Sequence, residues 1–503
     1  MAHIRIVDLP CGYGKSSQIF KQFDKRQNYA VVVPYLSEVD RFIIDAKKFS
    51  DFNLTQPKSS SSNKSDHCEK LIRAGKSVVC SHALFYRLGT LSTFVTDQIK
   101  SVDGTDDFFG KVCYGHLLDD YNLIIDEVID PFQIEQTVRQ VDFDEDYIGL
   151  GLAKVMEDGR VVPTDKWDDK YFSGSKTFSR QLYEKAKSGA LYRMGENLFV
   201  LTIPTELFLK PKSVTIYTYL SDGSLLLQFL SKLQADNPGT FTMEIERLDT
   251  AEEASWREDI ANALTVLTIS GVENKPWTHN AQLKRLKKHS DCASAAHELR
   301  KFKDSELYGV NLKTVMLTSA RELWHGSKAG LKPKAGRLAK DARLFGHPVN
   351  QPIYDKVTET FVDNWSTTGV SFVPNTTRGT NAYIECTTAV YLYDQHPNPQ
   401  VLTFLGMKRN SLEARDFCNA YALTELVQWL FRSAIRVGGI NRSGRAYQPR
   451  RRVTLYMPSE RMRNLLLNWL LTGRVNAGPV TPKGPKQIEL LARLEGRQLA
   501  VAA

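Results

Sequence analysis

The sequence predicts an α/β protein of two or three domains, and three observations support this fold class. With 503 residues, the chain exceeds one typical domain and leaves room for more than one buried core. Residues 4–34 have the order strand, glycine-rich turn, helix, strand, which is the βαβ unit of a parallel sheet. Strand patterns recur along the rest of the chain, at 76–81, 123–125, 213–220, 312–318, 369–373 and 389–393.

The first strand pattern leads into a loop that is typical of phosphate binding. After Pro10, this loop supplies two glycines, a lysine and a serine: Gly12, Gly14, Lys15 and Ser16. Glycines let backbone N–H groups approach a phosphate, the lysine reaches the β and γ phosphates, and the serine hydroxyl holds magnesium. The stretch therefore predicts a site for ATP and Mg2+. A glycine-rich turn before an ordinary helix is the alternative, since Leu9 stands where the usual first glycine falls.

A second motif, YNLIIDEVID at 121–130, contains a short apolar strand that ends in two carboxylates, Asp126 and Glu127. Beside a phosphate loop, the first carboxylate can hold magnesium and the second can orient or polarise the attacking water. The two motifs together are more specific for ATP hydrolysis than either one alone. The alternative is that Asp126 and Glu127 only begin a surface loop.

Composition and cysteine usage favour the cytoplasm. No apolar run has the length of a membrane span, and the N-terminus enters a strand directly, unlike a signal peptide. Residues 51–67 predict a surface loop. The cysteines are scattered and form no CxxC pair, which argues against zinc and disulfides: Cys11, Cys68, Cys80, Cys113, Cys292, Cys386 and Cys418.

The net charge of +9 comes from the C-terminal segment. Residues 441–503 hold 12 Lys and Arg against 3 Asp and Glu, and the remainder of the chain is balanced. This excess favours contact with a polyanion, most simply nucleic acid, and a solvated tail is the alternative. Two further basic stretches, 284–303 and 326–345, leave the same choice open between a solvated surface and a phosphate-backbone contact.

Residues 425–436, ELVQWLFRSAIR, predict a helix with a polar face. Gln428, Arg432 and Arg436 recur every four residues, a spacing that stacks them on one side of a helix. Two arginines in such a stack suit a phosphate chain. An exposed amphipathic helix is the alternative.

Taken in order, these stretches resemble the motifs of a superfamily two (DExD/H-type) helicase over residues 4 to about 440. The matching stretches are LPCGYGKSS (9–17) for motif I, VVVPYLSEVDR (31–41) for Ia, VVCSHALF (78–85) for Ib, IIDEVID (124–130) for II, TIYTYLSD (215–222) for III, TVMLTSA (314–320) for IV, TTRGTNAY (376–383) for V and QWLFRSAIR (428–436) for VI. The last two are also similar to phage-encoded members. The resemblance implies two tandem RecA-like domains, with ATP in the cleft between them and nucleic acid across the top.

The resemblance also implies residue roles. Asp126 and Ser16 would hold the metal, Glu127 would position water, Gln428 would contact the nucleotide, and Arg432 and Arg436 would act as arginine fingers. Thr218 would couple hydrolysis to domain movement. ATP contacts would come from Gly12, Tyr13, Gly14, Lys15, Ser16, Ser17, Arg378, Gly379 and Asn381. Nucleic-acid contacts would come from Pro34, Tyr35, Ser81, His82, Thr318, Thr376 and Thr377.

The sequence departs from the family pattern at several points. Tyr219 and Leu220 replace the last two residues usual in motif III, and Asn381 stands where Asp is commoner. The second arginine of motif VI follows the first by four residues instead of three. The few residues before the first strand leave no room for the adenine-reading glutamine element of DEAD-box members, which favours a DExH-like or phage-type compact helicase.

These observations predict a RecA-like domain at 1–233, a helical linker at 234–305, a second RecA-like domain at 306–440 and a basic extension at 441–503. The expected activity is ATP-driven movement along a nucleic-acid strand, with single-stranded DNA favoured over RNA and a replication or recombination protein as partner. A viral packaging ATPase is one alternative, disfavoured because 441–503 lacks the carboxylates of a nuclease. A helicase-like binding protein without turnover is the other.

Overall fold

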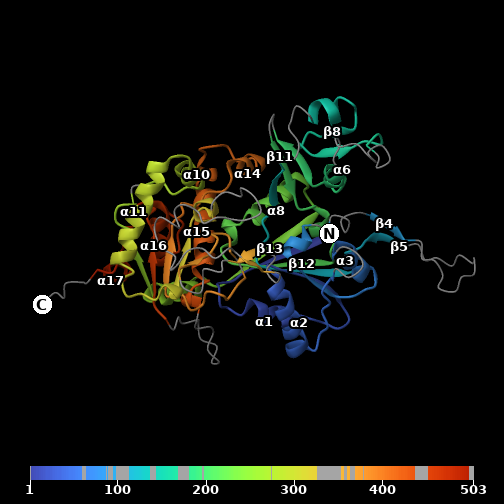
Figure 1. Ribbon diagram of the computed structural model, residues 1–503. Helices are drawn as coiled ribbons and strands as arrows, with labels where there is room; N and C mark the ends of the chain where they lie inside the picture. The colour runs from blue at the N-terminus through green and yellow to red at the C-terminus, as the bar shows by residue number, and fades with distance from the viewer. Residues whose placement is uncertain are drawn as a thin grey trace, which may run out of the picture.

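The computed structural model describes residues 2–58, 64–86, 88, 94–97, 113–135, 143–167, 180–194, 198–273, 275–325, 353–355, 360–362, 369–377, 379–436 and 451–497. It contains two α/β units that lie side by side, each built on a parallel sheet (Figure 1). The expected fold class of two tandem parallel-sheet domains is confirmed. Arg378 and the predicted basic stretch 326–345 lie outside the described residues.

The first sheet is parallel throughout and has the strand order β13-β1-β12-β6-β2-β3. Its strands are β1 (Ala2–Asp8), β2 (Asn28–Val33), β3 (Val78–Ser81), β6 (Tyr121–Asp126), β12 (Ser213–Thr218) and β13 (Phe241–Arg247). Val31 and Val33 pack with Phe20 of α1 (Lys15–Lys21) and Phe42 of α2 (Leu36–Ser50), whereas Val32 belongs to the core under α8 (Leu225–Asp236). Because helices cover both faces, the central strands are continuous apolar runs.

The first unit extends past the expected boundary at residue 233. Strand β13 pairs with β1 from Ala2↔Phe241 to Asp8↔Arg247. This segment was expected to be helical. Its sequence FTMEIER alternates apolar and polar residues, as an edge strand with one half-buried face does.

The second sheet is also parallel, with the order β14-β20-β19-β15-β18. Its strands are β14 (Leu264–Leu267), β15 (Val315–Thr318), β18 (Ser371–Phe372), β19 (Thr388–Tyr391) and β20 (Val453–Tyr456). Strand β20 lies inside the sheet, and α16 (Glu460–Thr472) buries Leu465 and Trp469 in the core. The described part of 441–503 therefore belongs to the second unit and is not an extension. Likewise, β14 from the expected linker is an edge strand of this sheet.

A separate lobe stands beside the first sheet (Figure 1). It contains β7 (Phe132–Glu135), β8 (Ala153–Val155), β9 (Val161–Pro163), α6 (Arg180–Lys187), β10 (Leu191–Met194) and β11 (Leu198–Thr202). Aromatic side chains form its own core, which includes Phe143, Tyr147, Trp167 and Phe199. The lobe is thus an insertion with its own small core between β6 and β12.

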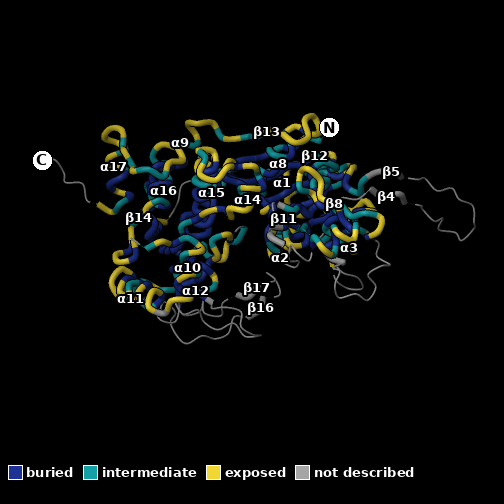
Figure 2. The backbone as a smooth tube through the Cα atoms, turned by 90° about the horizontal axis from the view of Figure 1, so that it is seen from above, coloured by how far each residue is buried: buried dark blue, intermediate teal, exposed yellow. Residues whose placement is uncertain are grey.

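The remaining elements cover the two sheets or extend from them. The helices are α3 (Lys64–Arg73), α4 (His82–Phe85), α7 (Glu206–Leu209), α9 (Thr250–Asn262), α10 (His279–Lys287), α11 (His289–Ser305), α12 (Arg321–His325), α14 (Pro399–Phe404), α15 (Leu412–Leu430) and α17 (Pro485–Leu494). Two antiparallel pairs join β4 (Phe94–Asp97) to β5 (Cys113–His116) and β16 (Ile353–Asp355) to β17 (Thr360–Val362). Figure 2 shows buried backbone in the interior of each unit and exposed backbone on outer helices such as α11. In the described part of the chain, no helix is both long enough and apolar enough to span a bilayer.

Helix α15 ends at Leu430, so the predicted helix over 425–436 is wrong in its last part. The N–H groups of Arg432 and Ser433 bond three residues back, to Trp429 O and Leu430 O. The Ser433 hydroxyl also donates to Leu430 O at 2.7 Å and competes with the helical pattern. A short 3-10 turn then covers Ala434–Arg436. Gln428 and the two arginines therefore do not share one helical face.

Candidate functional site

The carboxyl ends of β1, β12 and β6 are neighbours at one edge of the first sheet, where parallel α/β sheets bind ligands. The loop after β1 folds over this edge, and Lys15 Nζ donates hydrogen bonds to Leu9 O at 2.9 Å and to Thr218 O at 3.3 Å. Gly12 and Gly14 have φ of 90° and 70°, in the left-handed region that favours glycine. Helix α1 begins directly at Lys15. The predicted order of strand, loop and helix is confirmed.

Asp126 and Glu127 lie at the end of β6, and both are buried. Asp126 is 7% exposed, and burial together with the neighbouring charge of Glu127 raises the pKa of its carboxyl to about 7. Glu127 has φ of 67°, which is unusual for a residue other than glycine. Its backbone N–H donates to Tyr217 O at 3.0 Å. Such strained backbone is held where the surroundings fix it, and it occurs at functional sites.

Glu127 forms an ion pair with an arginine of the second unit. Arg432 Nη2 lies 3.3 Å from Glu127 Oε1, and the Arg432 side chain is 1% exposed. Arg436 is near enough to Arg432 and Glu127 for their charges to act on its guanidinium, and burial together with the charge of Arg432 lowers its pKa. The structure thus gathers both predicted arginines at the Asp126–Glu127 strand end. The turn after α15 places the two arginines there, whereas the sequence had predicted that they share one face of a helix.

The residues present fit a polyphosphate. Arg432 is buried and Arg436 is half-buried, and two cations held close together are stabilised when an anion lies between them. Lys15 adds a third positive group that is near enough to Asp126 to lower its pKa. Arg432 Nε and Thr218 Oγ1 are also buried polar atoms without a hydrogen-bond partner within the described ranges. Of the other predicted loop contacts, Tyr13 is buried, Ser16 is half-buried and Ser17 is exposed.

Magnesium would be held at the same edge. Mg2+ in nucleotide sites binds one or two protein oxygens and takes its other ligands from phosphate and water. Asp126 and Ser16 are the residues that would hold it, one from each motif. The described residues contain no cluster of three or more His, Cys, Asp or Glu side chains arranged to bind a metal by themselves.

The segment after β12 joins the phosphate loop to the second unit. Thr218 is fully buried and its carbonyl accepts the Lys15 hydrogen bond, and the next two carbonyls bond to α15. Gln428 Nε2 donates to Tyr219 O at 3.1 Å, and Thr424 Oγ1 donates to Leu220 O at 3.0 Å. The described contact of Gln428 is therefore with this segment. This arrangement connects the lysine of one unit to a helix of the other through three consecutive residues.

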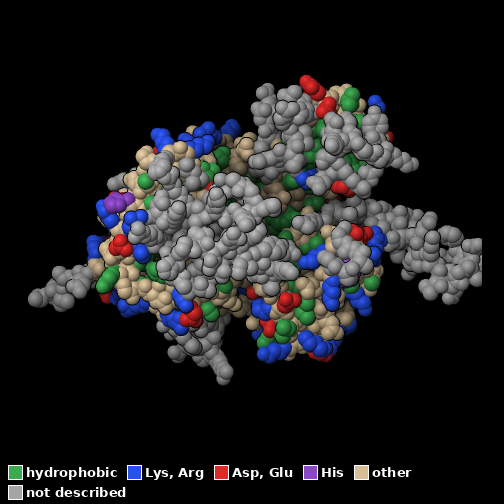
Figure 3. Space-filling view, in the orientation of Figure 1, with side chains coloured by type: hydrophobic (Ala, Val, Ile, Leu, Met, Phe, Trp, Pro, Cys, Tyr) green, Lys and Arg blue, Asp and Glu red, His purple; other side chains and the backbone are tan. Residues whose placement is uncertain are grey.

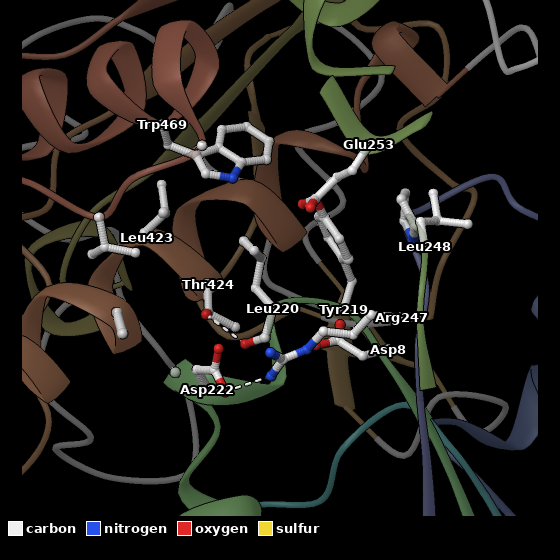
Figure 4. Close-up of a pocket in the computed structure, with 15 residues that line it drawn as sticks. Asp8, Tyr219, Leu220, Asp222, Arg247, Leu248, Glu253, Leu423, Thr424 and Trp469 are labelled. Atoms are coloured by element: carbon white, nitrogen blue, oxygen red, sulfur yellow. Dashed lines mark hydrogen bonds and ion pairs between the residues drawn. The ribbon is translucent and has the colours of Figure 1, made fainter. Parts of the chain in front are cut away.

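Behind this segment lies a cavity of about 230 Å3, which Figure 4 shows with its lining side chains. Arg247 at the end of β13 reaches Asp222 at 2.6 Å and Asp8 at 3.3 Å. Asp8 also accepts hydrogen bonds from the backbone N–H and the hydroxyl of Ser221. Sequence reasoning missed this group. Asp8 stands in the strand before the phosphate loop, but only the pairing of β13 with β1 brings Arg247 to it.

A second cavity, of about 280 Å3, lies between the two units, and we call it the interdomain cavity. Its lining includes four of the residues predicted to contact nucleic acid: Pro34, Tyr35, His82 and Thr376. Tyr86 and Tyr421 add aromatic lining that the sequence did not indicate. The two units touch at its rim, because a Cβ on Gly379, whose φ is 63°, would lie 2.6 Å from Pro34 Cγ. The expected motif Ia and motif V segments are therefore brought together.

Other predicted residues are not presented at this cavity. Thr318 is fully buried, and Thr377 is 8% exposed. Ser81 is buried and caps α4 by accepting a hydrogen bond from Leu84 N at 3.4 Å. Asn381 is exposed, and Arg378 lies outside the described residues. Sequence reasoning also gave no role to Glu38 and Arg41 of α2, whose charges act on the pKa of Asp126; both are contained in the motif Ia stretch.

Comparisons with known proteins found a family model, a curated relative and solved structures that are similar to this chain. Residues 274–470 match the family model described as the YonV C-terminal Rossmann-like domain. The SPbeta prophage-derived uncharacterized protein YonV of Bacillus subtilis (strain 168) is 22% identical over 488 residues, which cover 93% of this chain and 99% of YonV. A solved XPD helicase structure has a TM-score of 0.46 at 11% identity and covers 97% of this chain and 95% of its own. An apo XPD structure has a TM-score of 0.45 at 11% identity, with coverage of 93% and 94%. This chain is thus similar to a prophage protein along nearly its whole length.

Proposed function

We propose that this chain is an ATP-driven nucleic-acid motor, a helicase or translocase that couples ATP hydrolysis to movement along a strand. The observation that carries the proposal is the buried Glu127–Arg432 pair, which joins the two units at 3.3 Å. It stands at the strand edge that also carries Lys15 and Asp126. A water-positioning carboxylate on one unit and an arginine on the other are the parts that an interdomain phosphoryl-transfer site requires.

In this mechanism, ATP with its magnesium supplies the phosphoryl group that is transferred to water. Lys15, Arg432 and Arg436 bind phosphate oxygens and stabilise the charge that develops on them. Glu127, once released from Arg432, orients the attacking water and accepts its proton. The ionised carboxylate of Asp126 would hold the metal. Because burial raises the pKa of Asp126 to about 7, metal binding by the empty site strengthens as the pH rises through this value.

Movement follows from the contacts between the units. The hydrogen bonds from Gln428 and Thr424 to the segment after β12 tie α15 to the strand that carries the Lys15 contact. Opening and closing of the interface would therefore change the cavity between Pro34 and Thr376. The tyrosines of this cavity, Tyr35, Tyr86 and Tyr421, suit stacking with unpaired bases, which favours a single strand as the track.

The test is steady-state ATP hydrolysis by the full chain, alone and with single-stranded DNA, duplex DNA or single-stranded RNA. We expect stimulation by one polymer and its loss in Glu127→Gln. Lys15→Ala should abolish hydrolysis and retain binding of single-stranded DNA. Glu145→Gln, an exposed change in the inserted lobe, is the matched control and should behave as the wild type.

The outcomes separate the candidate functions. Hydrolysis that no polymer stimulates would contradict a nucleic-acid motor. Absence of hydrolysis with retained binding would favour a helicase-like binding protein. If Glu127→Gln hydrolyses ATP as the wild type does, the assignment of the water-positioning residue is wrong.

A further inference from the structure

The second unit carries a basic pocket that the proposed ATP and strand sites do not use. The pocket has a volume of about 520 Å3 and lies between the segment before α10, α10 itself and α11. Its lining includes five basic side chains and one acidic side chain, Asp291; the basic ones are Lys275, Lys284, Arg285, Lys287 and Lys288. Figure 3 shows Lys and Arg side chains gathered along this edge of the second unit. We call these five residues the α10 basic pocket.

Arg285 is fixed at the base of the pocket. Its guanidinium lies over the ring of Trp277, 4.4 Å from the centroid, and donates a hydrogen bond to Pro276 O. Arg285 is 7% exposed, and burial lowers the pKa of its guanidinium. Its Nη1 atom is buried without a hydrogen-bond partner in the described part of the chain. A buried cation with an unused donor is the feature expected of an anion site.

Three of the four lysines around Arg285 are exposed, and Lys275 is half-buried. Lys284, Lys287 and Lys288 form no ion pair with any residue that the structure describes. Among the described residues, Lys275 donates a hydrogen bond to a neutral group, Ser294 Oγ, at 2.8 Å. Positive charges of this density attract a polyanion, and the affinity comes largely from release of its counterions.

The α10 basic pocket and the interdomain cavity lie along one edge of the second sheet. Gln282 of α10 donates to Trp277 O at 2.8 Å and to Leu392 O, just after β19, at 3.0 Å. Asp394 N also donates to Trp277 O, at 2.9 Å. The next residue, Gln395, donates to the hydroxyl of Tyr421 at 3.3 Å, and Tyr421 lines the interdomain cavity. A continuous series of contacts therefore joins the two places.

We propose that the α10 basic pocket binds the phosphate backbone of the nucleic-acid strand that the interdomain cavity holds, and so lengthens the track over the second unit. This inference rests on the proposed function. Because the described lining of the pocket offers charge and no aromatic side chain, the contact is independent of base sequence.

The test compares the wild type with Lys284→Gln/Lys287→Gln/Lys288→Gln in binding of a long oligothymidylate over a range of salt concentrations. These three side chains are exposed, so the triple variant keeps the fold. Each phosphate contact on a single strand adds about 0.7 to the steepness with which the logarithm of the binding constant falls against the logarithm of the salt concentration. Loss of three contacts should therefore reduce this slope by about 2. The matched control, Lys47→Gln/Lys48→Gln/Lys70→Gln, removes three exposed lysines of α2 and α3 and should keep the wild-type slope.

ATP hydrolysis without nucleic acid should be the same in the wild type and both triple variants. If the wild type binds oligothymidylate and the α10 variant keeps its slope, the inference is overturned and the proposed function stands. If the wild type binds no nucleic acid, both are overturned. If inorganic pyrophosphate binds to the wild type and not to the α10 variant while the oligothymidylate slope is unchanged, the pocket is a site for small phosphates and the inference is overturned.

Discussion

Replacing Asp126 by Asn tests the electrostatics of the site independently of turnover. Asp126 is 7% exposed, and burial and the charge of Glu127 raise the pKa of its carboxyl from 3.8 to about 7. The amide of Asn has nearly the shape of the protonated acid and never ionises. The substitution should therefore stabilise the empty protein at the pH where the wild type carries a buried charge, and it should abolish metal-dependent hydrolysis.

The sign follows from proton linkage. Between pH 3.8 and about 7 the unfolded chain has lost the Asp126 proton and the folded chain still binds it, so the free energy of unfolding falls as the pH rises. The rise of the Asp126 pKa from 3.8 to about 7 changes the free energy of unfolding by at most about 4 kcal/mol, at about 1.36 kcal/mol per pKa unit. Of this, about 3 kcal/mol develops between about pH 5 and about pH 8.

The assay is urea denaturation of wild type and Asp126→Asn at about pH 5 and about pH 8, in chelator, followed by tryptophan fluorescence. Relative to the wild type, the variant should gain about 3 kcal/mol in free energy of unfolding when the pH is raised from about 5 to about 8. Magnesium with a non-hydrolysable ATP analogue should then stabilise the wild type and not the variant, because ligand binding stabilises the folded state only.

A difference between the proteins that does not change with pH would refute the raised pKa of Asp126. Stabilisation of both proteins by the magnesium complex to the same extent would refute its assignment as a metal ligand. Asp120→Asn, an exposed change next to β6, is the control and should leave the pH dependence at the wild-type value.

Two further predictions concern the contacts between the units. Arg432→Met should lower the free energy of unfolding by about 3–5 kcal/mol, because it removes a buried partner of Glu127. The double variant Glu127→Gln/Arg432→Met should recover most of this loss in denaturation experiments and still fail to hydrolyse ATP. Gly223→Ala would place a Cβ 2.3 Å from Ala420 O and 2.2 Å from Thr424 Oγ1, so it should cost about 1–3 kcal/mol and weaken the stimulation of hydrolysis by nucleic acid.

Each of these predictions has a contrary result. If the Arg432→Met and double variants are equally unstable, the ion pair with Glu127 is not what makes Arg432 important for stability. If Gly223→Ala keeps wild-type stability and stimulation, α15 does not pack on the segment after β12 as the structure has it. The control for this change is Gly478→Ala, whose nearest neighbour would be the side-chain oxygen of Asn476 at 3.2 Å.

The sequence determined the local parts of the site. An apolar run followed by two glycines and a lysine is sufficient to predict the phosphate loop, because these residues are close together in the chain. The same holds for the strand that ends in Asp126 and Glu127. In the structure both glycines have the positive φ that the loop requires. The resemblance implied nucleic-acid contacts for Pro34, Tyr35, His82 and Thr376. All four line the interdomain cavity, and their binding role stays a prediction.

Only the tertiary structure decided which groups meet across the chain. The sequence spacing put Gln428, Arg432 and Arg436 on one helical face, but the helix ends at Leu430 and the turn carries Arg432 to Glu127, 305 residues away in sequence. Strand β20 lies between β14 and β19 in the second sheet, although composition alone suggested that its segment was a basic extension. Composition and periodicity describe a segment by itself, whereas pairing of strands and burial of charges depend on partners that the local sequence does not contain.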